Sequence, residues 1–232
     1  MEQAVILITG TRKGIGRFLA EYYASRDYRV VGCSRGPMDV DIPKYRHYCL
    51  DITNETDVKA MFNDVNTRYK RLDILINNAG IAMMNHTLLT PMAAVDNVLK
   101  TNVAGTYLFC RESAKIMKKN NMGRIINFST VAVPLKLEGE AIYAASKAAV
   151  VSLTQIMARE FADFGITVNT IGPTPIQTDL IRSIPKEKIE SLIQRQAIKR
   201  FGTFDDVVNT INFFISPQSG FITGQTLYLG GV

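Results

Sequence analysis

The chain has 232 residues, of which 47% are apolar and 21% are charged. At roughly 100 to 200 residues per domain, it can form one large domain or two small ones with a buried core. This composition excludes a disordered chain, a collagen-like repeat and a disulfide-stapled miniprotein. The net charge of +6 comes from scattered residues rather than from a basic run, so no nucleic-acid partner is expected.

The cysteines and the apolar segments indicate in which cellular compartment the protein is expected. Cys33, Cys49 and Cys110 are odd in number and widely spaced, which fits a reducing compartment and neither a disulfide framework nor a CxxC motif. His47 and His86 have no partners at metal-ligand spacing, so no metal is expected. The N-terminal residues lack the features of a signal peptide, and no segment approaches the roughly 20 apolar residues that cross a bilayer. We expect a cytoplasmic protein without a membrane partner.

Short apolar, β-branched runs alternate with longer amphipathic stretches along the whole chain, which is the pattern of βαβ units on a parallel sheet. The predicted strands are 4–9, 29–33, 46–50, 72–76, 123–129, 166–171 and 226–229. The predicted helices lie near 15–26, 55–70, 92–119, 141–164 and 204–216. No linker or internal repeat divides the chain, so we expect one doubly wound α/β domain over residues 1–232.

One segment, about residues 174–200, interrupts this alternation with prolines and a charged helical stretch. It follows a predicted strand, and open α/β sheets bind their ligands beyond the carboxyl ends of the strands. We predict a substrate loop there. A surface helical excursion without function is the alternative.

A glycine-rich segment follows the first predicted strand and leads into an amphipathic helix. It consists of Thr9, Gly10, Thr11, Arg12, Lys13, Gly14, Ile15 and Gly16. Glycines let the backbone turn sharply and approach a ligand closely, while a helix N-terminus offers N–H groups to a pyrophosphate. Because this segment lies between the first strand and the first helix of a βαβ series, dinucleotide binding is favoured over an ordinary turn.

Several motifs occur together in a fixed order. The TGxxxGxG pattern, followed by Asn77-Asn78-Ala79-Gly80 and by Tyr143-Ala144-Ala145-Ser146-Lys147, resembles the short-chain dehydrogenase/reductase family. Asp51-Ile52, Asn102 and Phe221-Ile222-Thr223-Gly224-Gln225 extend the resemblance over nearly the whole chain. The resemblance implies a Rossmann-type sheet of seven parallel strands in the order 3-2-1-4-5-6-7. It also implies a homo-oligomer, either a tetramer or a dimer.

The resemblance assigns cofactor contacts beyond the glycine turn. They are Asp51 and Ile52 at the adenine, Asn78, Ala79 and Gly80 at the nicotinamide and ribose, Ile176 and Thr178 at the nicotinamide amide, and Tyr143 and Lys147.

Four residues bear on the choice between NAD(H) and NADP(H). Ser34 stands where NAD-preferring members of the family carry Asp, and Arg35 follows it. Arg12 and Lys13 in the glycine turn add positive charge on the same side. A 2′-phosphate recruits such groups through charge-assisted hydrogen bonds. We therefore expect NADP(H) in preference to NAD(H), with basic residues merely solvated on surface turns as the alternative.

Tyr143 and Lys147 lie four residues apart in a segment of high helical propensity, so their side chains share one helix face. An unperturbed tyrosine titrates near pH 10, and a nearby lysine cation with an oxidised nicotinamide would lower its pKa. In the family this Tyr exchanges a proton with the substrate oxygen, and the Lys supports it and holds the ribose. The family role of Asn102 is to hold a water in a proton relay, and capping of a helix bend is its alternative.

A third catalytic group should hydrogen-bond the substrate oxygen as charge develops there. The family uses a serine about 13 residues before the Tyr. In this chain Thr130 lies 13 residues before Tyr143, and Ser129 lies 14 before it. We predict Thr130 as this group, with Ser129 as the alternative.

These motifs together predict an NADP(H)-dependent carbonyl reductase that acts on a small-molecule ketone or alcohol. The chain looks closest to the 3-oxoacyl-carrier-protein reductases, which are the first alternative. Asn121 and Phe164 stand where those enzymes carry arginines that dock the carrier protein, which favours a smaller ketone. A non-catalytic dinucleotide-sensing protein on the same fold is the second alternative. The joint presence of Tyr143, Lys147 and Asn102 argues against it.

Overall fold

The computed structural model describes residues 3–178, 181 and 185–232. The described residues form one parallel sheet with the strand order β3-β2-β1-β4-β5-β6-β7. This confirms the Rossmann-type doubly wound α/β domain predicted from the sequence. All seven predicted strands are present, with ends displaced by at most two residues: β1 Val5–Thr9, β2 Arg29–Ser34, β3 Tyr45–Cys49, β4 Ile74–Asn77, β5 Gly123–Phe128, β6 Ile166–Gly172 and β7 Thr226–Tyr228.

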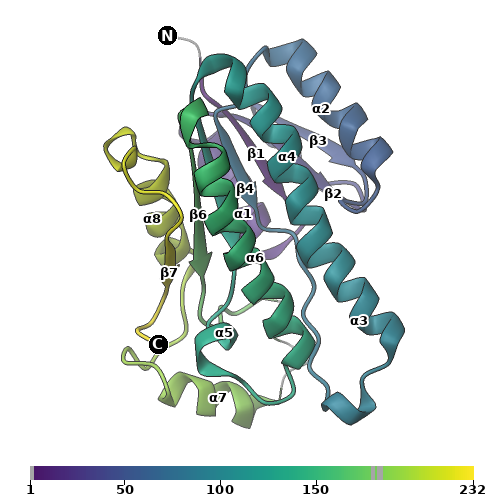
Figure 1. Cartoon of the computed structure of the whole chain (residues 1–232), viewed down its shortest axis with the longest axis vertical. Helices are drawn as coiled ribbons and strands as arrows, with labels where there is room; N and C mark the ends of the chain where they lie inside the picture. The colour runs from purple at the N-terminus through teal and green to yellow at the C-terminus, as the bar shows by residue number, and fades with distance from the viewer. Residues whose placement is uncertain (1–2, 179–180, 182–184) are drawn as a thin grey trace.

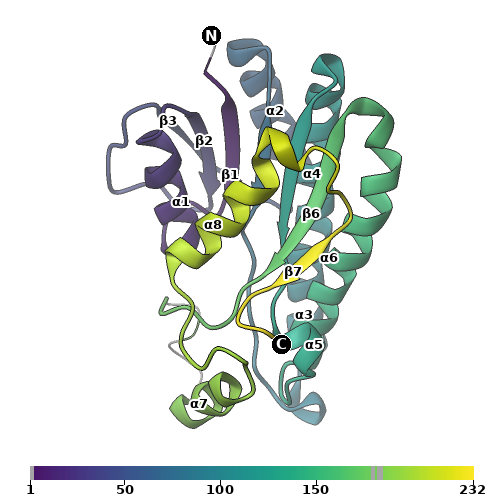
Figure 2. The ribbon, with the colours of Figure 1, turned by 90° about the vertical axis from the view of Figure 1, so that its left-hand side faces the viewer.

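Helices cover both faces of the sheet (Figures 1 and 2). Along β1, Val5 and Leu7 pack toward α2, α4 and α6, whereas Ile6 and Ile8 pack toward α1 and α8. Successive side chains of a strand point to opposite faces, so a strand buried on both faces reads as a continuous apolar run. The helices are α1 Gly14–Ala24, α2 Glu55–Tyr69, α3 Met92–Leu99, α4 Thr106–Met117, α5 Ala132–Leu135, α6 Ala141–Glu160, α7 Lys186–Gln194 and α8 Phe204–Ile215.

The single helix predicted over 92–119 is wrong, because a π-helical segment, Lys100–Gly105, separates α3 from α4. Asn102 is fully buried within this segment, and its side chain binds the backbone of Ile81 instead of facing solvent. A Cβ atom on Gly105 would lie 2.8 Å from Ile52 Cδ1, so the helix approaches its neighbour closely here. Such π-helical insertions are stabilised by tertiary contacts, which apolar periodicity does not reveal.

Among the described residues, α6 is the one helix long and apolar enough to cross a membrane. In this fold α6 contributes Met157 and Ala158 to the core beside the sheet, and it carries the buried Lys147. Core helices of globular proteins can have the same length and composition, and we interpret α6 as such a helix.

The carboxyl ends of the strands point toward α5 and α7, as the arrow of β6 shows in Figure 1. After β6 the chain crosses this end of the sheet, and Ile176 forms a parallel bridge with Gly202. Arg195 Nη2, just after α7, donates a hydrogen bond of 2.6 Å to the carbonyl oxygen of Leu135 at the end of α5. Residues 179–180 and 182–184 of the predicted substrate loop lie outside the described residues.

Candidate active site

The glycine turn packs tightly against the end of β2. The N–H groups of Gly10 and Thr11 donate hydrogen bonds of 2.8 and 3.2 Å to the carbonyl oxygen of Cys33. Gly10 has a φ of +76°, and a Cβ atom on Gly16 would lie 2.3 Å from the Gly10 oxygen, so both positions require glycine. Among the described residues no side chain caps α1, which begins at Gly14. Its first N–H groups therefore fit the pyrophosphate of a dinucleotide.

The segment after β4 is held directly on this turn. Asn78 Nδ2 donates hydrogen bonds to the carbonyl oxygens of Thr9 at 2.9 Å and Gly10 at 3.3 Å. The N–H of Ala79 donates to Thr9 Oγ1 at 2.9 Å. Two motifs that are far apart in the sequence thus meet at one edge of the sheet.

The residues predicted to select the cofactor gather at the end of β2. Ser34 Oγ donates a hydrogen bond of 2.7 Å to the carbonyl oxygen of Gly36. The Arg12 guanidinium lies against the same glycine, because a Cβ atom there would be 2.6 Å from Arg12 Nη1. Arg12, Lys13 and Arg35 are all exposed. The Arg12 side chain therefore lies beside the turn that follows β2, in which Arg35 stands.

Asp51 and Ile52, which are predicted to contact the adenine, line a cavity beside Arg35. Gly10, Ser34 and Ala79 also line this cavity. Burial acts to raise the pKa of Asp51. Hydrogen bonds from Thr53, together with the charges of Arg35 and Lys100, outweigh that effect and lower the pKa. Asp51 is therefore ionised at neutral pH, and its charge partly balances Arg35.

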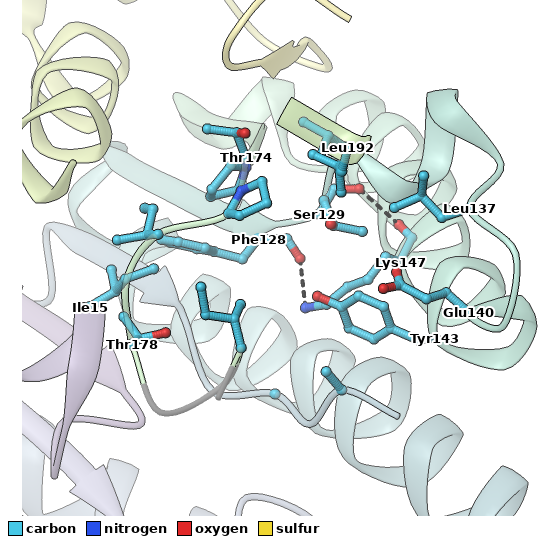
Figure 3. Close-up of a pocket in the computed structure, with 18 of the residues that line it drawn as sticks. Ile15, Phe128, Ser129, Leu137, Glu140, Tyr143, Lys147, Thr174, Thr178 and Leu192 are labelled. Carbon is cyan, nitrogen blue, oxygen red and sulfur yellow. Dashed lines mark hydrogen bonds between the residues drawn. The ribbon is translucent and has the colours of Figure 1, made fainter. Parts of the chain in front are cut away.

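A second cavity, shown in Figure 3, brings the predicted catalytic residues together. Its lining residues include Ser129, Thr130, Tyr143, Lys147, Ile176 and Thr178. Lys147 is 5% exposed, and its Nζ donates a hydrogen bond of 2.9 Å to the carbonyl oxygen of Phe128 at the end of β5. The cavity also contains Asn78 and Gly80, so it continues toward the glycine turn.

Burial is the main cause of the pKa shifts of Tyr143 and Lys147. It raises the pKa of Tyr143 to about 12, with the Glu140 charge acting in the same direction and the Thr130 hydroxyl opposing it as a hydrogen-bonding group. Burial also lowers the pKa of Lys147 to about 8. Burial therefore determines the pKa of Tyr143 in the protein alone, and the lowering expected with an oxidised nicotinamide bound stays a prediction. A neutral phenol at pH 7 suits a proton donor to a carbonyl oxygen.

The depressed pKa of Lys147 has a measurable effect on stability. An unfolded lysine titrates near pH 10.4, so between about 8 and that value the unfolded chain binds more protons than the folded chain. The stability contributed by this site therefore rises with pH. We expect the free energy of unfolding of the cofactor-free wild type, relative to Lys147→Met, to increase by ~2 kcal/mol from about pH 7 to about pH 10. Denaturant titrations of both proteins measure this difference. A difference that stays constant over the range would contradict the depressed pKa.

Ser129 and Thr130 differ in what their hydroxyl groups face. Ser129 is 3% exposed, and its Oγ donates to the carbonyl oxygen of Lys147 at 3.4 Å (Figure 3). Thr130 Oγ1 accepts the N–H of Ala132 at 3.3 Å, which leaves its proton for another acceptor. Hydrogen bonding by the Thr130 hydroxyl also lowers the pKa of the Tyr143 phenol, against the effect of burial. This geometry favours Thr130 as the group that hydrogen-bonds the substrate oxygen.

We expect Thr130→Val to lower kcat about 100-fold, because it keeps the branched shape and removes one donor to the substrate oxygen. Ser129→Ala serves as the matched control and should change kcat far less, since that hydroxyl faces the backbone of α6. Steady-state kinetics of both variants at saturating cofactor make the comparison. The reverse order of effects would assign the role to Ser129.

Asn102 binds both backbone groups of Ile81, whose N–H donates to Oδ1 at 2.9 Å and whose carbonyl accepts from Nδ2 at 2.9 Å. Nδ2 also donates to Ser146 Oγ at 3.0 Å, and that hydroxyl donates to the Tyr143 carbonyl at 2.7 Å. A Cβ atom on Gly80 would lie 3.1 Å from Asn102 Oδ1 and 3.2 Å from Lys147 Nζ. Asn102 therefore connects the segment after β4 to α6 through hydrogen bonds to Ile81 and Ser146. Its part in a proton relay stays a prediction.

Two residues near the site did not emerge from the sequence. Glu140 lines the catalytic cavity and lies three residues before Tyr143, and this closeness in sequence could have indicated it. His47 on β3 was interpreted as a satisfied or solvated histidine. Its Nε2 contacts the Gly36 oxygen at 2.9 Å, and its Nδ1 contacts the Tyr45 hydroxyl at 2.7 Å. His47 thus supports the turn after Ser34.

The fold, the glycine turn and the Tyr143–Lys147 pair at one edge of the sheet define a dinucleotide-dependent oxidoreductase. A family described as enoyl-(acyl carrier protein) reductase matches residues 10–231. The chain belongs to the short-chain dehydrogenase/reductase family, whose members act on CH–OH or C=O groups with NAD(P).

Individual relatives cover almost the whole chain. The 3-oxoacyl-[acyl-carrier-protein] reductase FabG of Vibrio cholerae serotype O1 is 31% identical over 100% of this chain and 97% of its own. The solved structure of ElxO with NADP bound has a TM-score of 0.90 and 31% identity, covering 98% of this chain and 97% of that one. 4-Hydroxyisoleucine dehydrogenase complexed with NADH has a TM-score of 0.88 and 28% identity, covering 99% of this chain and 98% of that one.

Proposed function

We propose that the protein is an NADP(H)-dependent carbonyl reductase that converts a small-molecule ketone to a secondary alcohol. The observation that carries this proposal is the catalytic cavity, where Tyr143, Lys147 and Thr130 line one wall near the glycine turn. A solely dinucleotide-sensing protein could use Lys147 to hold the ribose, but it has no use for the Tyr143 and Thr130 hydroxyls in the same cavity.

The chain's own residues account for the proton chemistry. The bound nicotinamide supplies the hydride that reduces the carbonyl carbon. The Tyr143 hydroxyl, neutral because burial raises its pKa to about 12, donates a proton to the carbonyl oxygen. The Thr130 hydroxyl donates a hydrogen bond to the same oxygen and stabilises its developing charge. Lys147, fixed by the Phe128 carbonyl at 2.9 Å, holds the ribose and favours loss of the phenolic proton.

The preference for NADP(H) rests on the end of β2. Arg12 Nη1 lies against Gly36, Arg35 lines one cavity with Ser34, and no carboxylate stands at position 34 to repel a phosphate. Two or three cations near a dianion bind it through charge-assisted hydrogen bonds. The relatives support a dinucleotide generally, since ElxO is solved with NADP and 4-hydroxyisoleucine dehydrogenase with NADH.

A 3-oxoacyl-carrier-protein reductase is the second candidate, which the similarity to the Vibrio cholerae enzyme favours. Asn121 and Phe164 lack the positive charge that would dock an acidic carrier protein, so we place a smaller ketone first. We also propose a cytoplasmic homo-oligomer, a tetramer or a dimer. Large apolar side chains exposed on α4, α6 and α8 support the oligomer, among them Tyr107, Ile156 and Phe213.

The test is a steady-state assay of nicotinamide oxidation with NADPH and with NADH, over a panel of small ketones and an acyl-carrier-linked 3-ketone. We expect turnover of small ketones with a higher kcat/KM for NADPH. Robust turnover of the carrier-linked substrate alone would favour the second candidate. No turnover of any ketone with either cofactor would overturn the proposal.

A further inference from the structure

The catalytic cavity contains a carboxylate that the proton chemistry above does not use. Glu140 is 8% exposed and lines the cavity together with Tyr143 and Lys147. It immediately precedes α6, but its side chain does not cap that helix. Within the part of the chain that the structure describes, its carboxylate has neither a hydrogen-bond donor nor an ion-pair partner.

Leaving a buried carboxylate unpaired is unfavourable. A carboxylate removed from water must be paired or hydrogen-bonded, or its pKa rises and it becomes protonated. Burial raises the pKa of Glu140, and the charge of the exposed Lys188 on α7 only partly offsets this. A titratable group that is kept in this condition within a cavity indicates a ligand-binding role.

Among the described residues that line the catalytic cavity, the neighbours of Glu140 are mostly apolar, whereas Lys188 and Arg195 line an adjoining cavity that Glu140 also borders. Leu137 lies beside Glu140 and Leu192 of α7 lines the catalytic cavity, as Figure 3 shows. Ile181 and Val131 also line this cavity. The cavity's own cation, Lys147, is engaged by the Phe128 carbonyl. Low-polarity walls strengthen the attraction between Glu140 and a positive group that enters the cavity.

The position of Glu140 relative to Tyr143 fixes where that group would be. Both residues line this cavity, and they are close enough that the charge of Glu140 raises the pKa of Tyr143. A ligand whose carbonyl oxygen meets Tyr143 therefore reaches Glu140 with a group only a few bonds from the carbonyl carbon.

We propose that Glu140 is a specificity-determining residue that binds a protonated amine of the substrate, so that the substrate class is amino ketones with a short spacer. An ammonium group supplies the charge-assisted hydrogen bonds that the carboxylate lacks. This inference rests on the proposed reductase function and narrows its substrate.

The experiment compares matched ketones that differ in charge. Ketones with an ammonium group one, two or three carbons from the carbonyl are each paired with the neutral ketone in which a methyl group replaces it. For the wild type with NADPH, we expect kcat/KM for at least one ammonium ketone to exceed that for its neutral partner by about 10-fold or more. In Glu140→Gln this ratio should fall toward one, whereas Glu140→Asp should retain part of it.

Glu138→Gln is the matched control, because it makes the same change of charge two residues away at an exposed position. The ratio should be kept in this variant. Binding of the corresponding amino and neutral alcohols to the NADPH complex, followed by nicotinamide fluorescence, gives a second measurement that needs no turnover.

The outcomes separate the two proposals. Reduction of neutral ketones without any preference for the ammonium partners, or a preference that survives in Glu140→Gln, would overturn the role of Glu140 and leave the reductase function intact. Absence of turnover with every ketone would overturn the reductase function. In that case the alcohol titrations still decide the inference, since equal affinity for charged and neutral alcohols would refute it.

Discussion

Replacing Tyr143 by Phe is expected to lower kcat about 1,000-fold, because general acid catalysis by a positioned side chain contributes in the range of 10²–10⁴. The substitution removes one hydroxyl and keeps the ring that lines the cavity. The affinity for NADPH should stay within about twofold of the wild type, since the glycine turn and the end of β2 are untouched. Steady-state kinetics and a fluorescence titration of the cofactor measure the two quantities.

Tyr107→Phe provides the control for this result, since that tyrosine is 45% exposed on α4 and lies away from the cavity. Its kcat should equal that of the wild type. Retention of more than about a tenth of wild-type turnover by Tyr143→Phe would contradict its role as proton donor. Loss of NADPH affinity in parallel would instead indicate a structural role for the phenol.

Ser34→Asp is expected to reverse the preference for the cofactor. A carboxylate at this position would accept hydrogen bonds from the ribose hydroxyls of NAD(H) and would repel the 2′-phosphate of NADP(H). We expect kcat/KM for NADPH to fall about 100-fold, which corresponds to ~3 kcal/mol, while kcat/KM for NADH rises. The assay uses one ketone with both cofactors, so that changes at the substrate end cancel.

Ser34→Ala separates charge from the loss of the hydroxyl, whose Oγ donates to the Gly36 carbonyl at 2.7 Å. The alanine variant should lose some affinity for both cofactors and keep the preference for NADPH. A wild-type protein that uses NADH as well as NADPH would show that Arg12 and Arg35 do not bind a phosphate. An Asp variant that still prefers NADPH would show that position 34 does not control the choice of cofactor.

The sequence predicted the strands and their order well, for identifiable reasons. Strands such as β1 and β4 are buried on both faces, so they stand out as continuous apolar runs. The glycine turn is visible in the sequence because its backbone requires glycine at two positions. Gly10 has a positive φ, and Gly16 has no room for a Cβ atom. Family resemblance supplied the strand order, which no local pattern contains.

The features that were not predicted depend on partners distant in sequence. Within the π-helical segment, Asn102 binds Ile81, 21 residues earlier in the chain. The high pKa of Tyr143 follows from burial by the surrounding elements, whereas the sequence shows only the nearby Lys147. Glu140 is an ordinary acidic residue near a helix start when read in sequence. Its significance comes from the apolar walls that Leu137 and Leu192 contribute.

The two hydrogen bonds between the Asn102 side chain and the Ile81 backbone limit which residues position 102 tolerates. The amide of Asn102 presents a donor nitrogen and an acceptor oxygen on a short side chain, and it forms one hydrogen bond with each backbone group of Ile81. Aspartate lacks the donor, serine cannot bind both backbone groups, and glutamine is one methylene too long for a fully buried site. The backbone contacts of Asn102 therefore favour asparagine at this position whether or not the protein is catalytically active.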